Sequence, residues 1–253
     1  DFGDATAARS NIGSVSNAHG GLNDGYQGTR IAPIPRGPGV GQRALMLGGL
    51  NSGYTAQTSI DFLNITSTGN TSSFGDLNTG TGTEAAGSND VKAVSGNALA
   101  VGTNHINATL FASEGNSSDF GNLSVTRGRV GGASNSTRTI FGGGETPDKS
   151  NVIDYITIAT EGNATDFGNL SVARAAAAGL ASTTRLVFGG GHEGSVTYKD
   201  TMEYVTIGST GNTTDFGNLS SARGWCAGLG SSTRGVFAGG FTYAPPSTLT
   251  FFD

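Results

Sequence analysis

The sequence predicts an all-β fold, a five-bladed β-propeller with four antiparallel strands in each blade. Three observations predict it: one unit recurs along the chain, each unit holds four short β-type segments, and no segment of helical period is long enough to compete. The chain has 253 residues, of which 43 are glycine, and its net charge is -5. Because the net charge is low, the glycine-rich composition does not favour disorder.

The repeat is anchored on the tripeptide Asp-Phe-Gly or a near copy of it. Its phenylalanines are Phe2, Phe74, Phe120, Phe167 and Phe216. The spacings between them are 72, 46, 47 and 49 residues, so five copies of one unit fill the sequence.

Each unit presents its four predicted strands in the same order. An arginine is followed by a first strand of small residues, and the second strand is a short apolar run that ends in a glycine pair, as in residues 138–144, 185–191 and 234–240. The third strand alternates polar and apolar residues, as in 153–158 and 202–207. The fourth strand contains Asp-Phe-Gly. Four short strands in a repeat of this length are typical of a propeller blade.

Stacking of neighbouring blades explains how such a glycine-rich chain folds. A single blade buries little apolar surface, whereas both of its faces become core when neighbours pack around an axis. Strands that crowd the axis need residues without a Cβ, and the Gly-Asn turn before each fourth strand needs a positive φ.

We expect one domain over residues 1–253, closed by a terminal strand from each end of the chain. The third strand of the last blade is expected in residues 249–253 and its fourth strand at the N-terminus, where pairing satisfies two open edges. The blades are expected at about 9–79 (with an insertion at 17–42), 80–125, 126–172, 173–221, and 222–253 plus 1–8.

A charge pattern accompanies the repeat. The aspartate of the fourth strand lies eight residues before the arginine that opens the next blade, and the pairs are Asp1 and Arg9, Asp119 and Arg127, Asp166 and Arg174, and Asp215 and Arg223. In the remaining copy both charges are absent, as Ser73 and Thr81. Joint presence and joint absence favour structural ion pairs between blades. A ring of arginines that binds a ligand is the alternative.

The insertion at 17–42 contains Pro33, Pro35 and Pro38, so we expect a semi-rigid loop. Insertions on a repeat scaffold often carry contacts. The residues predicted to contact a partner are Tyr26, Arg30 and Arg36. The alternative is a tolerated surface excursion.

No catalytic constellation is recognisable, and we expect a protein that is not an enzyme and holds no metal or cofactor. The three histidines lie in different blades without metal-ligand spacing, and Cys226 is the single cysteine. No nucleophile or phosphate-binding motif is present. Only 14 lysines and arginines are scattered along the chain, which argues against nucleic acid as a partner, and no apolar run is long enough for membrane insertion.

The loops between second and third strands share one face with the loops between blades. The residues predicted to bind a ligand there are Tyr54, His105, Asp148, His192, Tyr198 and Tyr243. Aromatic and polar side chains of this kind suit stacking on sugar rings and hydrogen bonding to hydroxyls. The alternative is that these residues reflect the ordinary sequence variability of propeller loops and bind no ligand. Carboxylates in the same loops leave glycan hydrolysis open, provided that two of them lie about 5–10 Å apart beside a pocket.

The order of these segments resembles a Kelch-type propeller repeat, with Phe120, Phe167 and Phe216 where Kelch blades usually have tryptophan. The run Gly-Asn-x-Thr-Asp-Phe-Gly-Asn-Leu-Ser-x-Ala-Arg, followed by Arg-x-Val-Phe-x-Gly-Gly, is similar to repeats of large virion proteins of marine bacteriophages, especially those that infect cyanobacteria. Residues 17–42 fall outside the resemblance.

The resemblance implies a non-catalytic virion protein of a tail or fibre appendage. Its implied location is the extracellular particle, where it forms part of a homo-oligomer. Its implied partners are other virion proteins and a host surface glycan or receptor. Two alternatives remain: a glycan-binding lectin or glycan-acting enzyme, and a structural module for capsid decoration or a tail nozzle.

Overall fold

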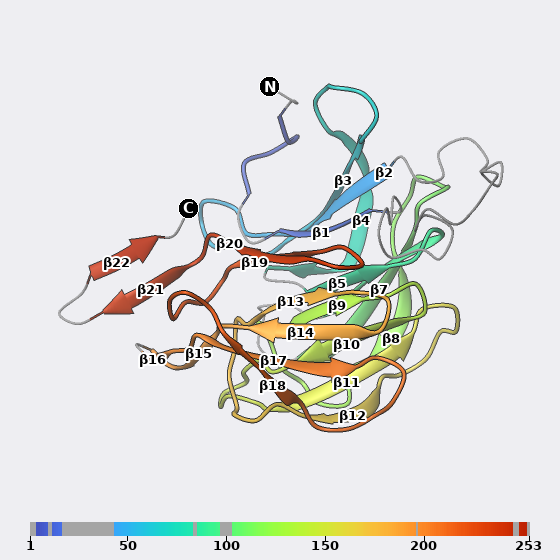
Figure 1. Cartoon of the computed structure of the whole chain (residues 1–253). Helices are drawn as coiled ribbons and strands as arrows, with labels where there is room; N and C mark the ends of the chain where they lie inside the picture. The colour runs from blue at the N-terminus through green and yellow to red at the C-terminus, as the bar shows by residue number, and fades with distance from the viewer. Residues whose placement is uncertain are drawn as a thin grey trace.

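The computed structural model describes residues 4–9, 12–16, 43–82, 85–96, 103–195, 197–244 and 248–251. These residues form an all-β structure of several small antiparallel sheets and contain no helix (Figure 1).

Four of the sheets have four strands each. The first contains β1 (Gly13–Ser16), β2 (Arg43–Leu47), β3 (Gln57–Asn64) and β4 (Ser72–Thr81). The second contains β5 (Ala85–Ser88), β6 (Lys92–Gly96), β7 (His105–Leu110) and β8 (Ser118–Asn122). The third contains β9 (Gly131–Ser134), β10 (Arg138–Gly142), β11 (Val152–Thr157) and β12 (Thr165–Asn169). The fourth contains β13 (Ala178–Ala181), β14 (Arg185–Gly189), β17 (Thr201–Thr206) and β18 (Thr214–Asn218).

Three hairpins complete the described strands. They are β15 (His192–Gly194) with β16 (Thr197–Tyr198), β19 (Ala227–Gly230) with β20 (Gly235–Ala238), and β21 (Phe241–Ala244) with β22 (Thr248–Phe251). The expected third strand at 249–253 therefore differs: its described part, β22, pairs with β21 and not with β20. Only three residues separate β21 from β22, so this hairpin is the most local pairing open to the segment.

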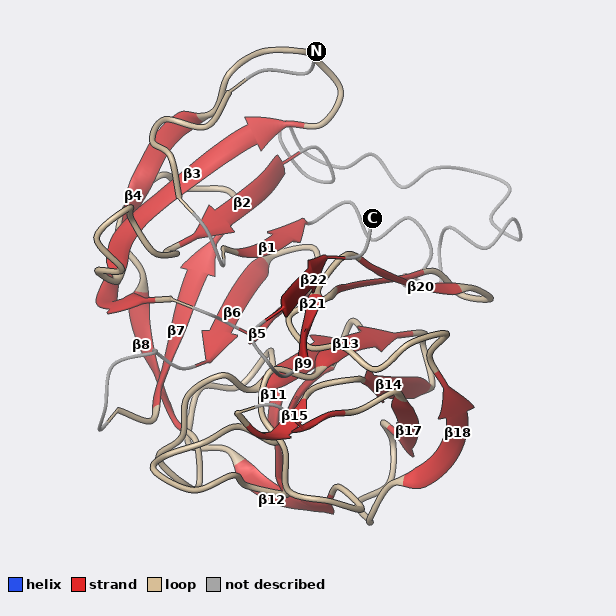
Figure 2. Ribbon diagram, turned by 90° about the vertical axis from the view of Figure 1, so that its left-hand side faces the viewer, coloured by secondary structure: helices blue, strands red, loops and turns tan. Residues whose placement is uncertain are grey.

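Neighbouring sheets contact one another through their first strands. Each of β1, β5, β9 and β13 contacts the first strand of the next unit, ending with β19. Figure 2 shows the first strands of the four sheets nearer the middle of the molecule and the fourth strands β4, β8, β12 and β18 at its periphery. Because both faces of a sheet meet neighbours, apolar side chains from two successive units share each core cluster.

An aromatic ring and a glycine interlock successive sheets. A Cβ at Gly142 would lie 2.6 Å from the ring of Phe188 in the next sheet. The same arrangement joins Gly96 to Phe141 and Gly189 to Phe237. The glycine that ends one second strand thus makes room for the phenylalanine of the next, which explains their recurrence in the sequence.

A second interlock lies at the periphery, where a Gly-Asn turn packs on the fourth strand of the preceding sheet. The N–H of Gly162 donates to the carbonyl of Phe120 (2.8 Å), and Asn163 Oδ1 accepts from the N–H of Asn122 (3.0 Å). The N-terminal segment makes the equivalent contact with the first sheet, since Asn70 Oδ1 accepts from the N–H of Asp4 (2.9 Å). Residues 4–9 therefore lie where a fourth strand and its following loop lie in the other units.

The arginines pair with a different carboxylate from the one predicted. Arg127 Nη2 lies 3.0 Å from Asp154 Oδ2, and Arg174 Nη2 lies 2.6 Å from Glu203 Oε1. Arg9 pairs in the same way with Asp61. All six side chains are at most 2 % exposed, and each acid lies on the third strand of the sheet that its arginine opens.

The predicted partners were wrong for Arg127 and Arg174 because strand geometry turns Asp119 and Asp166 outward. Asp119 and Asp166 directly precede the buried Phe120 and Phe167, and successive side chains of a strand point to opposite faces. Asp119 and Asp166 are accordingly exposed, and Asp215 is also exposed. Asp1 lies outside the described residues, and Arg223 donates to the carbonyl oxygen of Gly239 at 3.3 Å.

Candidate functional site

Equivalent loop positions of three successive units build the candidate site. The residue after the opening arginine forms an antiparallel bridge with the residue after the glycine pair. These bridges are Gly128 with Glu145, Ala175 with His192, and Gly224 with Phe241. Each bridge has two backbone hydrogen bonds of 2.9–3.0 Å. The bridges fix the positions of Glu145, His192 and Phe241 against the loops between units.

The next residue of each loop has a positive φ. These residues are Arg129, Ala176 and Trp225, with φ of 54°, 54° and 55°. The N–H of Trp225 donates to the carbonyl of Ala176 (3.1 Å), and the N–H of Ala176 donates to the carbonyl of Arg129 (2.9 Å). This chain of backbone bonds offsets the local cost of the left-handed conformation and holds the three positions in a row.

Four rings gather beside this row, and we call His192, Tyr198, Trp225 and Phe241 the aromatic cluster. The Trp225 ring is stacked between those of His192 (4.8 Å between centroids, 17°) and Phe241 (4.7 Å, 6°). The ring of Tyr198 lies 5.9–6.2 Å from the other three. Offset ring pairs at these separations contribute about 0.5–1.5 kcal/mol each beyond burial.

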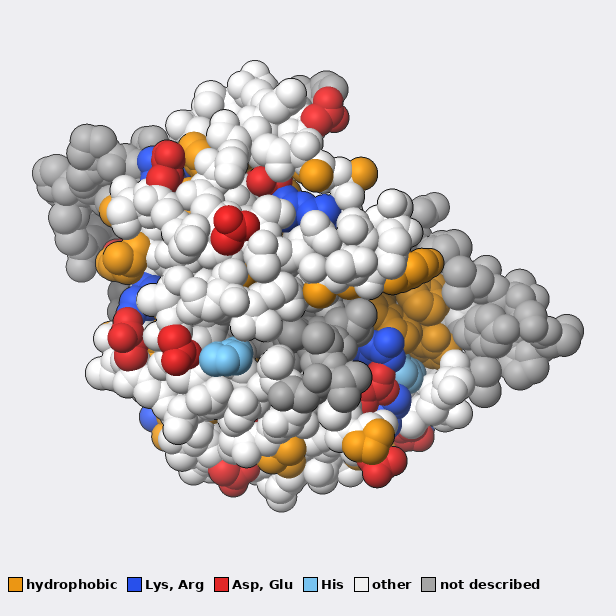
Figure 3. Space-filling model, turned by 180° about the vertical axis from the view of Figure 1, so that it is seen from behind, with side chains coloured by type: hydrophobic (Ala, Val, Ile, Leu, Met, Phe, Trp, Pro, Cys, Tyr) orange, Lys and Arg blue, Asp and Glu red, His pale blue; other side chains and the backbone are white. Residues whose placement is uncertain are grey.

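Charged side chains border the aromatic cluster. Arg129 Cζ lies 5.8 Å from the Trp225 ring, and both Arg129 and Lys149 pair with Glu145. Lys199 pairs with Glu193 at 2.9 Å. Figure 3 shows hydrophobic side chains gathered beside a group of basic and acidic side chains, with a histidine at the margin.

His192 is the most buried member, with 4 % of its surface exposed. Its Nδ1 lies 3.1 Å from the carbonyl oxygen of Gly194, so the neutral ring donates there and offers Nε2 as an acceptor. Burial and the nearby charges of Lys149 and Arg129 lower the pKa of His192. Nε2 itself has no hydrogen-bond partner among the described residues. The site thus holds a buried, neutral acceptor.

Two neighbours of His192 also have shifted protonation equilibria. Burial raises the pKa of Tyr198, and burial together with the charge of Arg129 lowers the pKa of Lys149. At neutral pH the tyrosine therefore keeps its hydroxyl proton and offers a donor at the edge of the cluster.

Of the six residues predicted to bind a ligand, the structure brings His192 and Tyr198 together. Tyr54 is 82 % exposed in a turn of the first sheet, where its N–H donates to the carbonyl of Asn51. His105 lies in the second sheet, with Nδ1 3.7 Å from Asp119 Oδ1. Asp148 is exposed.

The remaining predicted contacts fall partly outside the description. Tyr243 belongs to β21, where it is paired with Leu249, and its side chain lies outside the described part. Tyr26, Arg30 and Arg36 of the insertion lie outside the described residues.

Sequence reasoning missed Trp225, Phe241 and Arg129. Their signal was positional: Arg129 and Trp225 both lie two residues after an opening arginine, and Phe241 directly follows a glycine pair, as His192 does. A comparison of equivalent positions across repeats would have grouped these residues.

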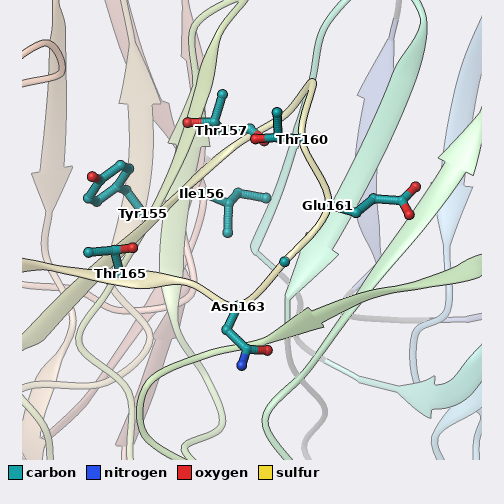
Figure 4. Close-up of a pocket in the computed structure, with 8 residues that line it drawn as sticks. Tyr155, Ile156, Thr157, Thr160, Glu161, Asn163 and Thr165 are labelled. Carbon is teal, nitrogen blue, oxygen red and sulfur yellow. The ribbon is translucent and has the colours of Figure 1, made fainter.

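A separate pocket of about 150 Å³ lies at the hairpin between β11 and β12 (Figure 4). Tyr155, Thr160, Glu161, Asn163 and Thr165 are among its lining residues. Glu161 pairs with Lys92 at 3.1 Å, and Asn163 accepts from the backbone of the second sheet. These two residues already serve the contact between sheets, so the aromatic cluster is the better candidate for a ligand.

The acidic side chains beside the aromatic cluster are engaged in ion pairs: Glu145 pairs with Arg129 and Lys149, and Glu193 pairs with Lys199. Within the described ranges no group of three histidine, cysteine or acidic residues is placed to hold a metal ion. The same residues include no helix with the length and apolar character needed to cross a membrane.

Comparisons with protein families and with curated proteins gave no match, either to a family model or to a curated sequence.

Proposed function

We propose that this chain is a five-bladed Kelch-like propeller that serves as a non-catalytic component of a virion tail or fibre. In this proposal the loops around the aromatic cluster bind a host surface glycan, and other surfaces contact neighbouring virion subunits. In this proposal the site binds the glycan and catalyses no covalent reaction.

The propeller architecture is supported by the order of the sheets. Four successive units have the same strand order, and the hairpin of β19 and β20, whose first strand contacts β13, would supply the first two strands of a fifth. Residues 4–9 contact the first sheet as a preceding fourth strand does, through Asp4 and Asn70. This contact supports the assignment of residues 1–8 to the outer strand of a fifth blade.

Glycan binding is supported chiefly by the stacked rings of His192, Trp225 and Phe241 beside an unpartnered His192 Nε2. Aromatic surfaces pack against the C–H faces of sugar rings, and a buried acceptor can bond a hydroxyl. Arg129 and Tyr198 add donors at the margin.

Binding is favoured over glycan hydrolysis by the state of the carboxylates. A glycosidase needs one carboxylic acid and one carboxylate free to act on opposite sides of a bond. Glu145 and Glu193 are engaged by Arg129, Lys149 and Lys199. Assignment to a virion is supported by the resemblance of the repeat, and several copies on one particle would strengthen weak individual contacts through avidity.

A glycan array probed with the whole chain tests the proposal. We expect binding to one class of cell-surface polysaccharide, and we expect Trp225→Ala to weaken it about tenfold or more because the central ring of the stack is removed. Tyr54→Ala is the matched control, since Tyr54 is an exposed aromatic residue of the same loop class outside the aromatic cluster. Turnover of a glycan, or binding that Trp225→Ala leaves unchanged, would refute the proposed site.

A further inference from the structure

The basic side chains beside the aromatic cluster outnumber the acidic side chains that pair with them. Arg129 and Lys149 both pair with the single carboxylate of Glu145. On the other side of the cluster Lys199 pairs with Glu193. These pairs hold three cations and two anions, so the border of the cluster keeps one positive charge that no carboxylate of the pairs offsets.

Two further acids in the same loops take no part in these pairs. Asp148 precedes Lys149 and is exposed, and Asp200 follows Lys199. Neither forms an ion pair among the residues that the structure describes. Water screens a charge such as that of Asp148, which therefore acts weakly on the buried side of the site.

The positive potential of the border reaches the buried ring of His192. Burial is the main cause that lowers the pKa of His192, and the charges of Lys149 and Arg129 lower it further. Both charged groups that shift this pKa are cations. An anionic group placed beside these three side chains would therefore meet a favourable field, because partial burial weakens screening by salt.

Arg129 is the side chain best placed to meet such a group. It is 33 % exposed, compared with 20 % for Lys149 and 18 % for Glu145. Among the described residues its guanidinium donates one hydrogen bond, from Nη1 to Glu145, which leaves other N–H groups open to a ligand. Arg129 Cζ lies 5.8 Å from the Trp225 ring. A group bound to this guanidinium would thus lie beside a sugar packed on the aromatic cluster.

The backbone holds Arg129 in this position. Its carbonyl accepts the N–H of Ala176 at 2.9 Å. The preceding residue, Gly128, forms two backbone hydrogen bonds of 2.9 Å with Glu145. The guanidinium and its carboxylate partner therefore come from two loops that are tied together, and a ligand meets groups that are already in place.

We propose that the glycan bound at the aromatic cluster is acidic, and that the acid group of one sugar binds the guanidinium of Arg129 while the sugar packs on the aromatic cluster. The inference rests on the glycan binding proposed above and narrows it to one class of ligand. A carboxylate matches the planar fork of an arginine with two parallel charge-assisted bonds, and a sulfate offers its oxygens to the same donors. Lys149 adds a second cation, and His192 Nε2 accepts a hydroxyl of the same sugar.

Three acidic probes, each with a neutral counterpart, test the inference with the whole chain. They are polygalacturonate and its methyl ester, sialyllactose and its methyl ester, and a sulfated galactan and its desulfated form. The two carboxylate pairs and the sulfate pair distinguish the two sources of the negative charge. We expect at least one acidic probe to bind about tenfold more tightly than its counterpart, and added salt to weaken that binding.

Arg129→Gln is expected to weaken binding of the acidic probe about tenfold and to leave binding of the neutral counterpart unchanged, since Lys149 still pairs with Glu145. Arg129→Lys keeps the charge but loses the fork, so its affinity is expected to lie between the two. Arg185→Gln is the matched control. Arg185 Cζ also lies over an aromatic ring, at 4.6 Å from that of Tyr204, outside the aromatic cluster.

The inference is wrong if every neutral probe binds as tightly as its acidic form, or if Arg129→Gln binds the acidic probe as Arg185→Gln does. A glycan array that selects neutral glycans alone would also refute it. In these cases Trp225→Ala still reports on the aromatic cluster, and weaker binding by that variant would leave the proposed function standing. If no probe and no glycan of the array binds, the proposed function and this inference both fail.

Discussion

Arg127 Nη2 lies 3.0 Å from Asp154 Oδ2, and the two side chains are 1 % and 0 % exposed. In the preceding repeat the corresponding positions are Thr81, the last residue of β4, and Asn107 on β7, both 2 % exposed. The arginine and the acid are thus replaced together in one unit. Two neutral polar residues form a tolerated alternative to the ion pair in the same fold.

We therefore predict that Asp154→Asn alone destabilises the protein by about 3–5 kcal/mol, because it leaves the buried charge of Arg127 without its counter-ion. Chemical unfolding at constant pH measures the loss in free energy of unfolding.

The double variant Arg127→Thr with Asp154→Asn is expected to lose less free energy of unfolding than Asp154→Asn, since it introduces the threonine and asparagine of the preceding repeat and removes the unpaired buried charge. A double variant less stable than both single variants would contradict the idea that the two positions act as a unit.

The repeat predicted the strands of the first four units, but it assigned the arginines to the wrong acid. Alternation along β8 and β12 turns the aspartates outward, and the true partners lie on third strands, where the acid is Asp61, Asp154 or Glu203. The joint loss of charge was visible in the sequence as Ser73 with Thr81, yet the acid of the third strand is also replaced there, by Asn107 on β7. The joint loss of charges in one repeat is compatible with more than one choice of acid for each arginine, and only the three-dimensional structure distinguishes these choices.

Gly142→Ala is predicted to destabilise the protein by about 1–3 kcal/mol, because the added methyl group would lie 2.6 Å from the Phe188 ring and force the packing apart. Gly208→Ala is the matched control: a Cβ there meets nothing within 4 Å, and its φ is not in the left-handed region. Thermal or urea unfolding of both variants tests the interlock, and equal stability would show that the Phe188 ring moves freely.

Asn163→Ala is predicted to cost about 1 kcal/mol, since it removes the acceptor for the N–H of Asn122 at the periphery of two sheets. Thr160→Ala in the same hairpin is the control, because its side chain makes no contact with the second sheet among the described bonds. Hydrogen exchange at the Asn122 amide gives a local readout, and faster exchange is expected only for Asn163→Ala.

The candidate site was harder to predict than the strands. His192 and Tyr198 were found as polar and aromatic loop residues, but Trp225 and Phe241 come from a different unit, and only the backbone bonds between units place them beside His192. Tyr54 has the same chemistry, yet its turn belongs to the first sheet. Residue type identifies candidates, whereas their grouping depends on contacts between loops that the sequence does not encode locally.

His192 makes the stability of the aromatic cluster depend on pH. Its pKa is lowered in the fold, chiefly by burial and then by Lys149, so the unfolded chain binds a proton more readily than the native state does. The stabilisation is fully present above the unfolded pKa of about 6.5 and is lost as the pH falls towards the lower folded pKa. We expect the free energy of unfolding to be smaller at pH 5 than at pH 7.5. His192→Gln keeps a polar side chain that does not titrate and is expected to flatten this dependence. A pH dependence equally steep in His192→Gln would show that other groups produce it.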